Sequence, residues 1–173
     1  INYEHSKNRD HIQNPHSIMN LDSLLQSTSL MFGLHTLSCF FMTGLIWLVQ
    51  IIHYPAYRYM NIAVFKNYQN FHTTTITFIV GPVMLIELFT GLSILVQQKF
   101  GLFSSLNLLG LILIWVATAA WSVPKHGQLA QSYNPLIIES LISTNWARTI
   151  LWTLRSIFIL YFMIELLKSS PQP

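Results

Sequence analysis

Charged residues are scarce in this sequence. Asp, Glu, Lys and Arg together make up 9% of the 173 residues, whereas a soluble globular domain carries roughly 25%. The formal net charge is only +3 and no block of like charges occurs, so nucleic acid is not an expected partner. A chain this poor in charge is suited to a surface that faces lipid rather than water.

Several chemical motifs are also absent. The single cysteine, Cys39, lies inside an apolar run, so an intramolecular disulfide cannot form. The sequence contains no phosphate-binding glycine loop, no nucleophile triad and no cysteine cluster, which are the patterns that mark nucleotide, hydrolytic and metal–thiolate sites. Hydrolase and nucleotide-dependent functions are therefore poorly supported.

Long apolar runs are abundant. Hydrophobic residues make up 52% of the chain, and four stretches reach the roughly 20 apolar residues that a helix needs to cross a bilayer. They cover about residues 29–52, 74–96, 102–123 and 147–167. Helices satisfy their own backbone hydrogen bonds in lipid and isolated strands do not. The sequence predicts an all-α, up-down-up-down four-helix bundle in the membrane, forming one domain over residues 19–173.

The connections define two sides of the membrane. Four spans place both termini and the connection 97–101 on one side, called side A. The loops 54–73 and 124–146 then lie on side B, and both are long enough to hold short interfacial helices. Pro55 and Pro124 are expected to end the first and third helices, because proline lacks an N–H and clashes with the preceding turn. The basic residues slightly favour a cytoplasmic side B, which suggests a bacterial inner membrane protein.

The first 18 residues differ from the rest. They are polar and rich in Asn and His, and such a segment has little apolar surface to bury, so a disordered N-terminal tail is predicted. Met19 reads as a natural translation start, which raises the question of whether residues 1–18 belong to the native protein. The segment has no apolar h-region and does not resemble a signal peptide.

Ionisable residues within the spans form two sets. Such groups are costly at membrane depth and often mark function. The side-A set contains His35, Glu87, Tyr161 and Glu165. Antiparallel neighbouring helices could bring His35 and Glu87 together. Two interpretations stay open for that pair: a proton-handling or ligand-binding site, or a structural hydrogen bond between helices.

The side-B set is larger and contains Gln50, His53, His72, His126, Asn145, Arg148 and Arg155. His53, His72 and His126 come from three segments that meet at one membrane face. Neutral imidazole is a common metal ligand, so the three histidines are candidates for a transition-metal site or for haem ligation. The alternative is a group of ordinary interfacial histidines.

Two arginines of the fourth span complete the candidate site. Arg148, Trp152 and Arg155 share a helix face at spacings of four and three, and a buried Arg155 needs a partner, either Glu87 or an anionic ligand. The rigid fork of arginine suits planar anions. The candidate catalytic residues are His72, His126 and Glu87. The candidate cofactor-binding residues are His35, His53, Arg148 and Arg155.

Two stretches carry a family resemblance. Residues 34–60 and 79–95 resemble the HemJ type of protoporphyrinogen oxidase, with a histidine near the start of the first span and a Pro-x-Met then Gly pattern in the second. The resemblance implies haem ligation at His35 and matches Pro82, Met84 and Gly91 to the second-span pattern. The run from His53 to Ala56, His-Tyr-Pro-Ala, is similar to anthrone-oxygenase-like membrane proteins. The second half of the chain lies outside both resemblances.

Three functions remain open at this stage. The first is a membrane oxidoreductase or oxygenase-like enzyme, with haem or a transition metal as cofactor, acting on a flat hydrophobic substrate such as a porphyrin, quinone or polyketide. The second is a non-catalytic subunit whose polar residues contact partner helices or a second copy. The third is a small transporter or proton path around Glu87. The expected partners are the lipid bilayer and a hydrophobic or anionic small molecule.

Overall fold

Four long helical segments carry the fold of the computed structural model, which describes residues 15–169 and the side chains of residues 29–165, 167 and 168. The elements in chain order are α1 (Pro15–Leu48), η1 (Val49–His53), α2 (Tyr54–Ala56), η2 (Tyr57–Tyr59), α3 (Ile62–Gln97), α4 (Leu102–Ala117), η3 (Thr118–Ser122), α5 (Val123–Leu129) and α6 (Pro135–Ser169). The elements η1 and η3 are π-helices and η2 is a 3₁₀-helix. Residues 15–169 contain no β-strand.

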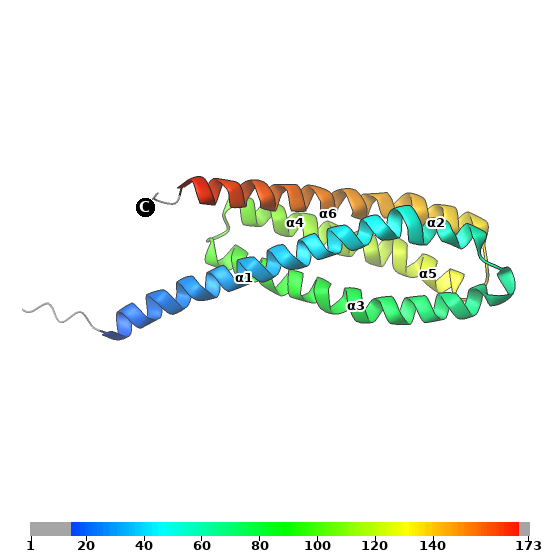
Figure 1. Cartoon of the computed structure of the whole chain (residues 1–173), viewed down its shortest axis with the longest axis horizontal. Coiled ribbons are helices and arrows are strands. Elements are labelled where there is room, and N and C mark those ends of the chain that lie inside the picture. Colours follow the sequence, from blue (N-terminus) through cyan, green and yellow to red (C-terminus); the bar gives the residue numbers. More distant parts are fainter. Residues whose placement is uncertain (1–14, 170–173) are drawn as a thin grey trace, which may run out of the picture.

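The long helices form one elongated bundle (Figure 1). Helix α1 packs against α3 and α6, and α4 packs against the same two helices. The described chain begins and ends at the same end of the bundle, which is also where α3 connects to α4. The predicted all-α, up-down-up-down fold is confirmed. Most of the predicted tail, residues 1–14, lies outside the described residues, and α1 begins at Pro15.

The bundle is apolar on its outside and buries a number of polar side chains beside its hydrophobic core. Four segments are long and apolar enough to cross a membrane: Ser29–Tyr59, Ile62–Gln97, Leu102–Leu129 and Pro135–Glu165. Large apolar side chains such as Phe78 and Phe89 are exposed, whereas His35, Glu87 and Arg155 are buried. This arrangement fits a lipid solvent, in which polar groups must find partners inside the bundle.

Pro55 and Pro124 do not end helices, so that prediction was wrong. Each lies just after a π-helix, and the helical path continues through α2 and α5. A proline ring clashes with the carbonyl four residues before it, which belongs here to Ile51 and Ala120. Both of these residues lie within the π-helices, where the wider turn makes room for the ring.

The two side-B connections are shorter than predicted. Helix α3 begins at Ile62, where Asn61 Oδ1 accepts a hydrogen bond from the Ala63 amide at 2.8 Å. Helix α6 begins at Pro135, where Asn134 Oδ1 accepts from the Leu136 amide at 3.0 Å. The predicted loops are therefore mostly helical. Each helix opens on a short apolar turn that is followed by polar residues such as Lys66 and Glu139, and these interrupt the apolar run by which a span is recognised.

The turn between α3 and α4 contains two residues in the left-handed region. Lys99 has φ 48° and Phe100 has φ 60°. The Phe100 amide donates to the Leu95 carbonyl at 2.9 Å, and the Lys99 amide donates to the Val96 carbonyl at 3.1 Å. This pair of bonds is a Schellman motif, whose left-handed position is usually glycine.

Replacing Lys99 with glycine is expected to raise the free energy of unfolding by about 0.5–1 kcal/mol, because glycine adopts positive φ without a Cβ clash. Unfolding in mixed micelles with increasing SDS, followed by circular dichroism, would measure the change. The matched control is Gln98→Gly, at the preceding residue with φ −84°, which should be neutral or destabilising. A less stable Lys99→Gly protein would contradict this interpretation of the turn.

Candidate functional site

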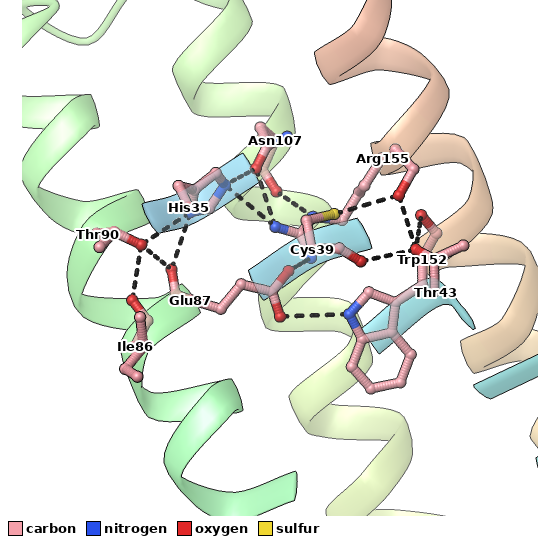
Figure 2. Close-up of polar contacts among 10 residues, drawn as sticks. His35, Cys39, Thr43, Ile86, Glu87, Thr90, Asn107, Trp152 and Arg155 are labelled. Atoms are coloured by element: carbon pink, nitrogen blue, oxygen red, sulfur yellow. Dashed lines mark hydrogen bonds and ion pairs between the residues drawn. The ribbon is translucent and has the colours of Figure 1, made fainter. Parts of the chain in front are cut away.

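A buried ion pair lies at the centre of the bundle. Arg155 of α6 donates through Nη1 to Glu87 Oε1 of α3, and both side chains are inaccessible or nearly so. Trp152 Nε1 donates to the other carboxylate oxygen, Oε2, at 3.3 Å. Arg155 also donates to Asn107 of α4, to its carbonyl oxygen at 3.2 Å and to Oδ1 at 3.0 Å. Figure 2 shows these contacts converging from neighbouring helices.

His35 of α1 joins this network through both ring nitrogens. Its Nδ1 lies 3.0 Å from Thr90 Oγ1 and 3.2 Å from the Glu87 carbonyl oxygen. Its Nε2 lies 2.8 Å from Asn107 Oδ1. His35, Glu87, Asn107, Trp152 and Arg155 are called the central cluster here. The expected approach of His35 to Glu87 occurs, but through the Glu87 backbone rather than its carboxylate (Figure 2).

Two glycines make room for side chains of the central cluster. A Cβ on Gly91 would lie 3.2 Å from His35 Cε1, and a Cβ on Gly110 would lie 3.0 Å from Arg155 Cδ. A Cβ on Gly44 would meet nothing within 4 Å. Small residues in membrane helices are usually explained by close backbone approach. Gly91 and Gly110 instead accommodate the polar side chains of the neighbouring helices.

The central cluster has the properties of a structural tie. It joins α1, α3, α4 and α6, and its one carboxylate and one guanidinium balance each other. Both carboxylate oxygens of Glu87 accept hydrogen bonds. Glu87 does not line the cavity of about 250 Å³ that lies between the helices. Of the two partners expected for Arg155, Glu87 is confirmed. Grouping Arg155 with the side-B residues was wrong, because the fourth helix begins at Pro135 and Arg155 lies deep in the bundle. Tyr161 and Glu165 are exposed, and Glu165 pairs with Lys168 at 2.9 Å.

The three side-B histidines do come together. The ring centroids of His53 and His72 are 4.1 Å apart, and those of His72 and His126 are 5.6 Å apart. They come from η1, α3 and α5. His126 Nε2 lies 2.9 Å from the Tyr54 hydroxyl, and its Nδ1 lies 2.8 Å from Gln69 Nε2.

His72 differs from His53 and His126 in having no hydrogen bond to the described part of the chain. Its side chain is 8% exposed, and its ring stacks on Tyr68 and packs against His53. Within the described part of the chain, no hydrogen-bond partner lies against either of its ring nitrogens. His53, by contrast, has Nε2 at 3.2 Å from the Tyr57 hydroxyl. A buried imidazole without a hydrogen-bond partner is uncommon. The cavity that His72 lines is therefore a candidate binding site.

Arg148 lies beside the histidines and contacts only neutral groups. Its Nε donates to Asn145 Oδ1 at 3.0 Å, and Nη2 donates to the same oxygen and, at 3.2 Å, to the Tyr54 hydroxyl. Its Nη1 donates to Thr118 Oγ1 at 3.4 Å. Asn145 is held in turn by Gln50, whose Oε1 accepts from Asn145 Nδ2 at 2.7 Å. His53, Tyr54, His72, His126 and Arg148 are called the side-B cluster here.

A cavity of about 250 Å³ adjoins the side-B cluster inside the bundle. Its polar end is formed by Tyr54, His72, Thr118, Ser122, His126 and Arg148. The remaining wall is mostly apolar and includes Ile46, Val80, Met84, Trp115 and Trp152. Thr77 of α3 and Val123 of α5 also line the cavity and are exposed, so it reaches the lipid-facing surface between these helices.

The geometry does not support the predicted metal and haem sites. Among the described residues, no group of three or more His, Cys, Asp or Glu side chains is arranged to hold a metal ion. The rings of His53 and His72 are in contact, which leaves no room for a porphyrin between them. Both ring nitrogens of His35 already have hydrogen-bonding neighbours. Metal binding and haem ligation stay predictions.

Sequence reasoning missed Tyr54, Tyr57, Tyr68 and Gln69. The sequence held a signal for two of them. Gln69 lies three residues before His72 and Tyr57 lies four residues after His53, so each shares a helix face with a histidine. Comparison with known proteins does not add to the site: no family model, no curated protein and no solved structure matches this chain. The resemblances to the HemJ type and to anthrone-oxygenase-like proteins therefore stay predictions.

Proposed function

We propose that this protein is a membrane enzyme that binds a small, mostly apolar molecule in the bundle cavity and acts on it through His72. The observation that supports the proposal is the position of His72, which lines the cavity without a hydrogen-bond partner among the described residues. Ligand pockets in proteins are mostly apolar with a few convergent polar groups. The cavity has this composition, and its opening toward lipid suits a substrate that dissolves in the bilayer.

The side-B cluster supplies the groups for proton transfer. A histidine within reach of a bound molecule can accept or donate a proton. His126 also lines the cavity and hydrogen-bonds to the Tyr54 hydroxyl, which accepts from Arg148. An oxidoreductase that adds hydrogen to its substrate or removes it needs such proton transfers, whichever group carries the electrons. Glu87 is not assigned a catalytic role, because its carboxylate is bonded to Arg155 and Trp152.

The proposal includes a location. The side-B end carries Arg58, Lys66 and Lys125, and basic residues are enriched on the cytoplasmic side of membrane proteins. This distribution favours a side-B cluster near the cytoplasmic face, and the membrane that we propose is a bacterial inner membrane.

The test is to block the cavity with one side chain. A Cβ on Gly81, which lines the cavity, would meet nothing within 4 Å, so Gly81→Phe should fold and fill the space. Small molecules extracted from the purified protein are compared by mass spectrometry. We expect a species that co-purifies with the wild type to be depleted about tenfold in Gly81→Phe, the loss that a displaced apolar ligand of this size implies.

The matched control is Gly44→Phe, the same substitution at an exposed position that also has open space and does not line the cavity. It should retain the wild-type species.

Once that species is identified, its conversion by the wild type and by His72→Gln is compared, and His72→Gln is expected to bind but not convert it. Equal recovery of every species from Gly81→Phe and Gly44→Phe would rule the proposal out.

A further inference from the structure

Among the described residues, no carboxylate lies beside the buried cation Arg148. Its side chain is 7% exposed, and its hydrogen-bond acceptors Asn145, Thr118 and Tyr54 are all neutral. The carboxylates with described side chains are committed elsewhere, Glu87 to Arg155, Glu139 to Arg58 and Glu165 to Lys168. The positive charge of Arg148 is therefore uncompensated among the described residues.

The unpaired charge of Arg148 contrasts with the paired charge of Arg155. The two arginines lie two turns apart on the same helix and are buried to the same degree. Arg155 has a carboxylate within hydrogen-bonding distance, whereas Arg148 has hydroxyl and amide oxygens. A charge taken out of water is expensive unless it is paired, and the Arg148 side chain is almost fully buried. A buried guanidinium held ready by neutral groups is the arrangement expected of an anion site.

Arg148 also has donor capacity left. A guanidinium carries five N–H donors. Nε donates once, Nη2 donates to two acceptors, and Nη1 donates to Thr118 alone. One N–H of Nη1 is thus without an acceptor in the described part of the protein. Arg148 lines the cavity together with His72, so a bound head group can reach both side chains.

From these observations we infer that the ligand of the cavity is an amphiphile with a single negative charge, a hydrophobic carboxylate, whose head group contacts Arg148 and His72. This inference rests on the proposed function, because it assigns a chemical class to the molecule in the same cavity. The apolar wall formed by Ile46, Val80 and Met84 accommodates the uncharged part. The guanidinium fork favours a planar carboxylate as its acceptor.

Two sources of such a carboxylate are compatible with the cavity. A fatty acid comes from the membrane itself and can enter between α3 and α5. An aromatic carboxylate comes from metabolism and would use the same charge with a flat apolar body. Two pairs of probes separate them: decanoate with decan-1-ol, and 2-naphthoate with 2-naphthalenemethanol. Within each pair the apolar part is matched and only the charge of the head group differs.

Equilibrium dialysis of the protein in lipid nanodiscs, with empty nanodiscs subtracted, measures binding of all four probes. Hydrogen bonds to charged groups predict that at least one carboxylate binds about tenfold to a hundredfold more tightly than its alcohol. Arg148→Gln should remove this preference, so that each carboxylate binds no more tightly than its alcohol. Lys66→Gln, which neutralises an exposed cation at the same end of the bundle, should keep it.

The outcomes separate this inference from the proposed function. Equal binding of each carboxylate and its alcohol in the wild type, with both reduced in Gly81→Phe, would overturn the anion site and retain the cavity as a binding site. Binding that Gly81→Phe does not reduce for any probe would overturn both. The comparison of acid with alcohol uses the wild-type protein, so it tests the anion site even if Arg148→Gln does not fold.

Discussion

Replacing Arg155 with alanine is expected to lower the free energy of unfolding by about 3–5 kcal/mol, because it leaves Glu87 charged, buried and without its partner. Glu87 is fully buried and receives a hydrogen bond from Arg155 through one carboxylate oxygen. The remaining donor, Trp152 Nε1, cannot neutralise the carboxylate. Unfolding in mixed micelles with increasing SDS, followed by circular dichroism, measures the loss.

Two further variants give this experiment its control. Arg58→Ala breaks an ion pair with Glu139 in which both side chains are about half exposed, and exposed pairs contribute about 0–1 kcal/mol. The double variant Glu87→Leu, Arg155→Met removes both charges and should recover much of the loss, because buried ion pairs can be replaced by apolar side chains of similar size. A stability of Arg155→Ala equal to that of Arg58→Ala would contradict the structural role of the central cluster.

Trp152→Ala is expected to be the second large effect, with a loss of about 3–5 kcal/mol, as for other fully buried aromatic residues. The Trp152 side chain has no exposed surface, lines the cavity and donates to Glu87. It is thus the contact between the central cluster and the ligand cavity. Its loss leaves a hole between them and removes one of the donors to the buried carboxylate.

Two matched tryptophan variants separate these contributions. Trp152→Phe keeps most of the ring volume and loses only the N–H donor, so it should cost about 1–3 kcal/mol. Trp146→Ala removes the same side chain from the lipid-facing surface, where it is 40% exposed and packs edge-on against Trp47, and should cost less than either. Thermal unfolding followed by near-ultraviolet circular dichroism measures all three. A wild-type transition for Trp152→Ala would show that this part of the bundle is loosely packed.

The spans were predictable because lipid imposes a simple rule on composition. Four apolar runs identify four helices, and each predicted run lies in one of the observed helical segments. The helix ends were not predictable in the same way. The first part of α3 and of α6 has polar residues close behind a short apolar turn, so hydropathy alone places the start too late, and the capping residues Asn61 and Asn134 mark where the helices begin. The effect of Pro55 and Pro124 depends on π-helices that composition does not reveal.

The candidate site was only partly predictable. His53, His72 and His126 meet because each lies near the same membrane face, which a depth estimate could anticipate. The depth of a residue in the membrane does not predict which side chains form a hydrogen bond or an ion pair with each other. Arg148 and Arg155 lie on one helix face and have similar sequence surroundings, yet one has a carboxylate and the other does not. That difference and the cavity itself arise from packing between helices, which no single stretch of sequence contains.

The two π-helices also set the angular phase of the residues that follow them. A π-turn holds one residue more than an α-turn, and one residue of α-helix corresponds to about 100° of rotation about the helix axis. Deleting one residue from η3 would turn His126 away from the cavity, and a deletion in η1 would do the same to Tyr54. The presence of Tyr54 and His126 at this polar end therefore depends on one additional residue in each π-helix, which a gene can gain or lose in one event.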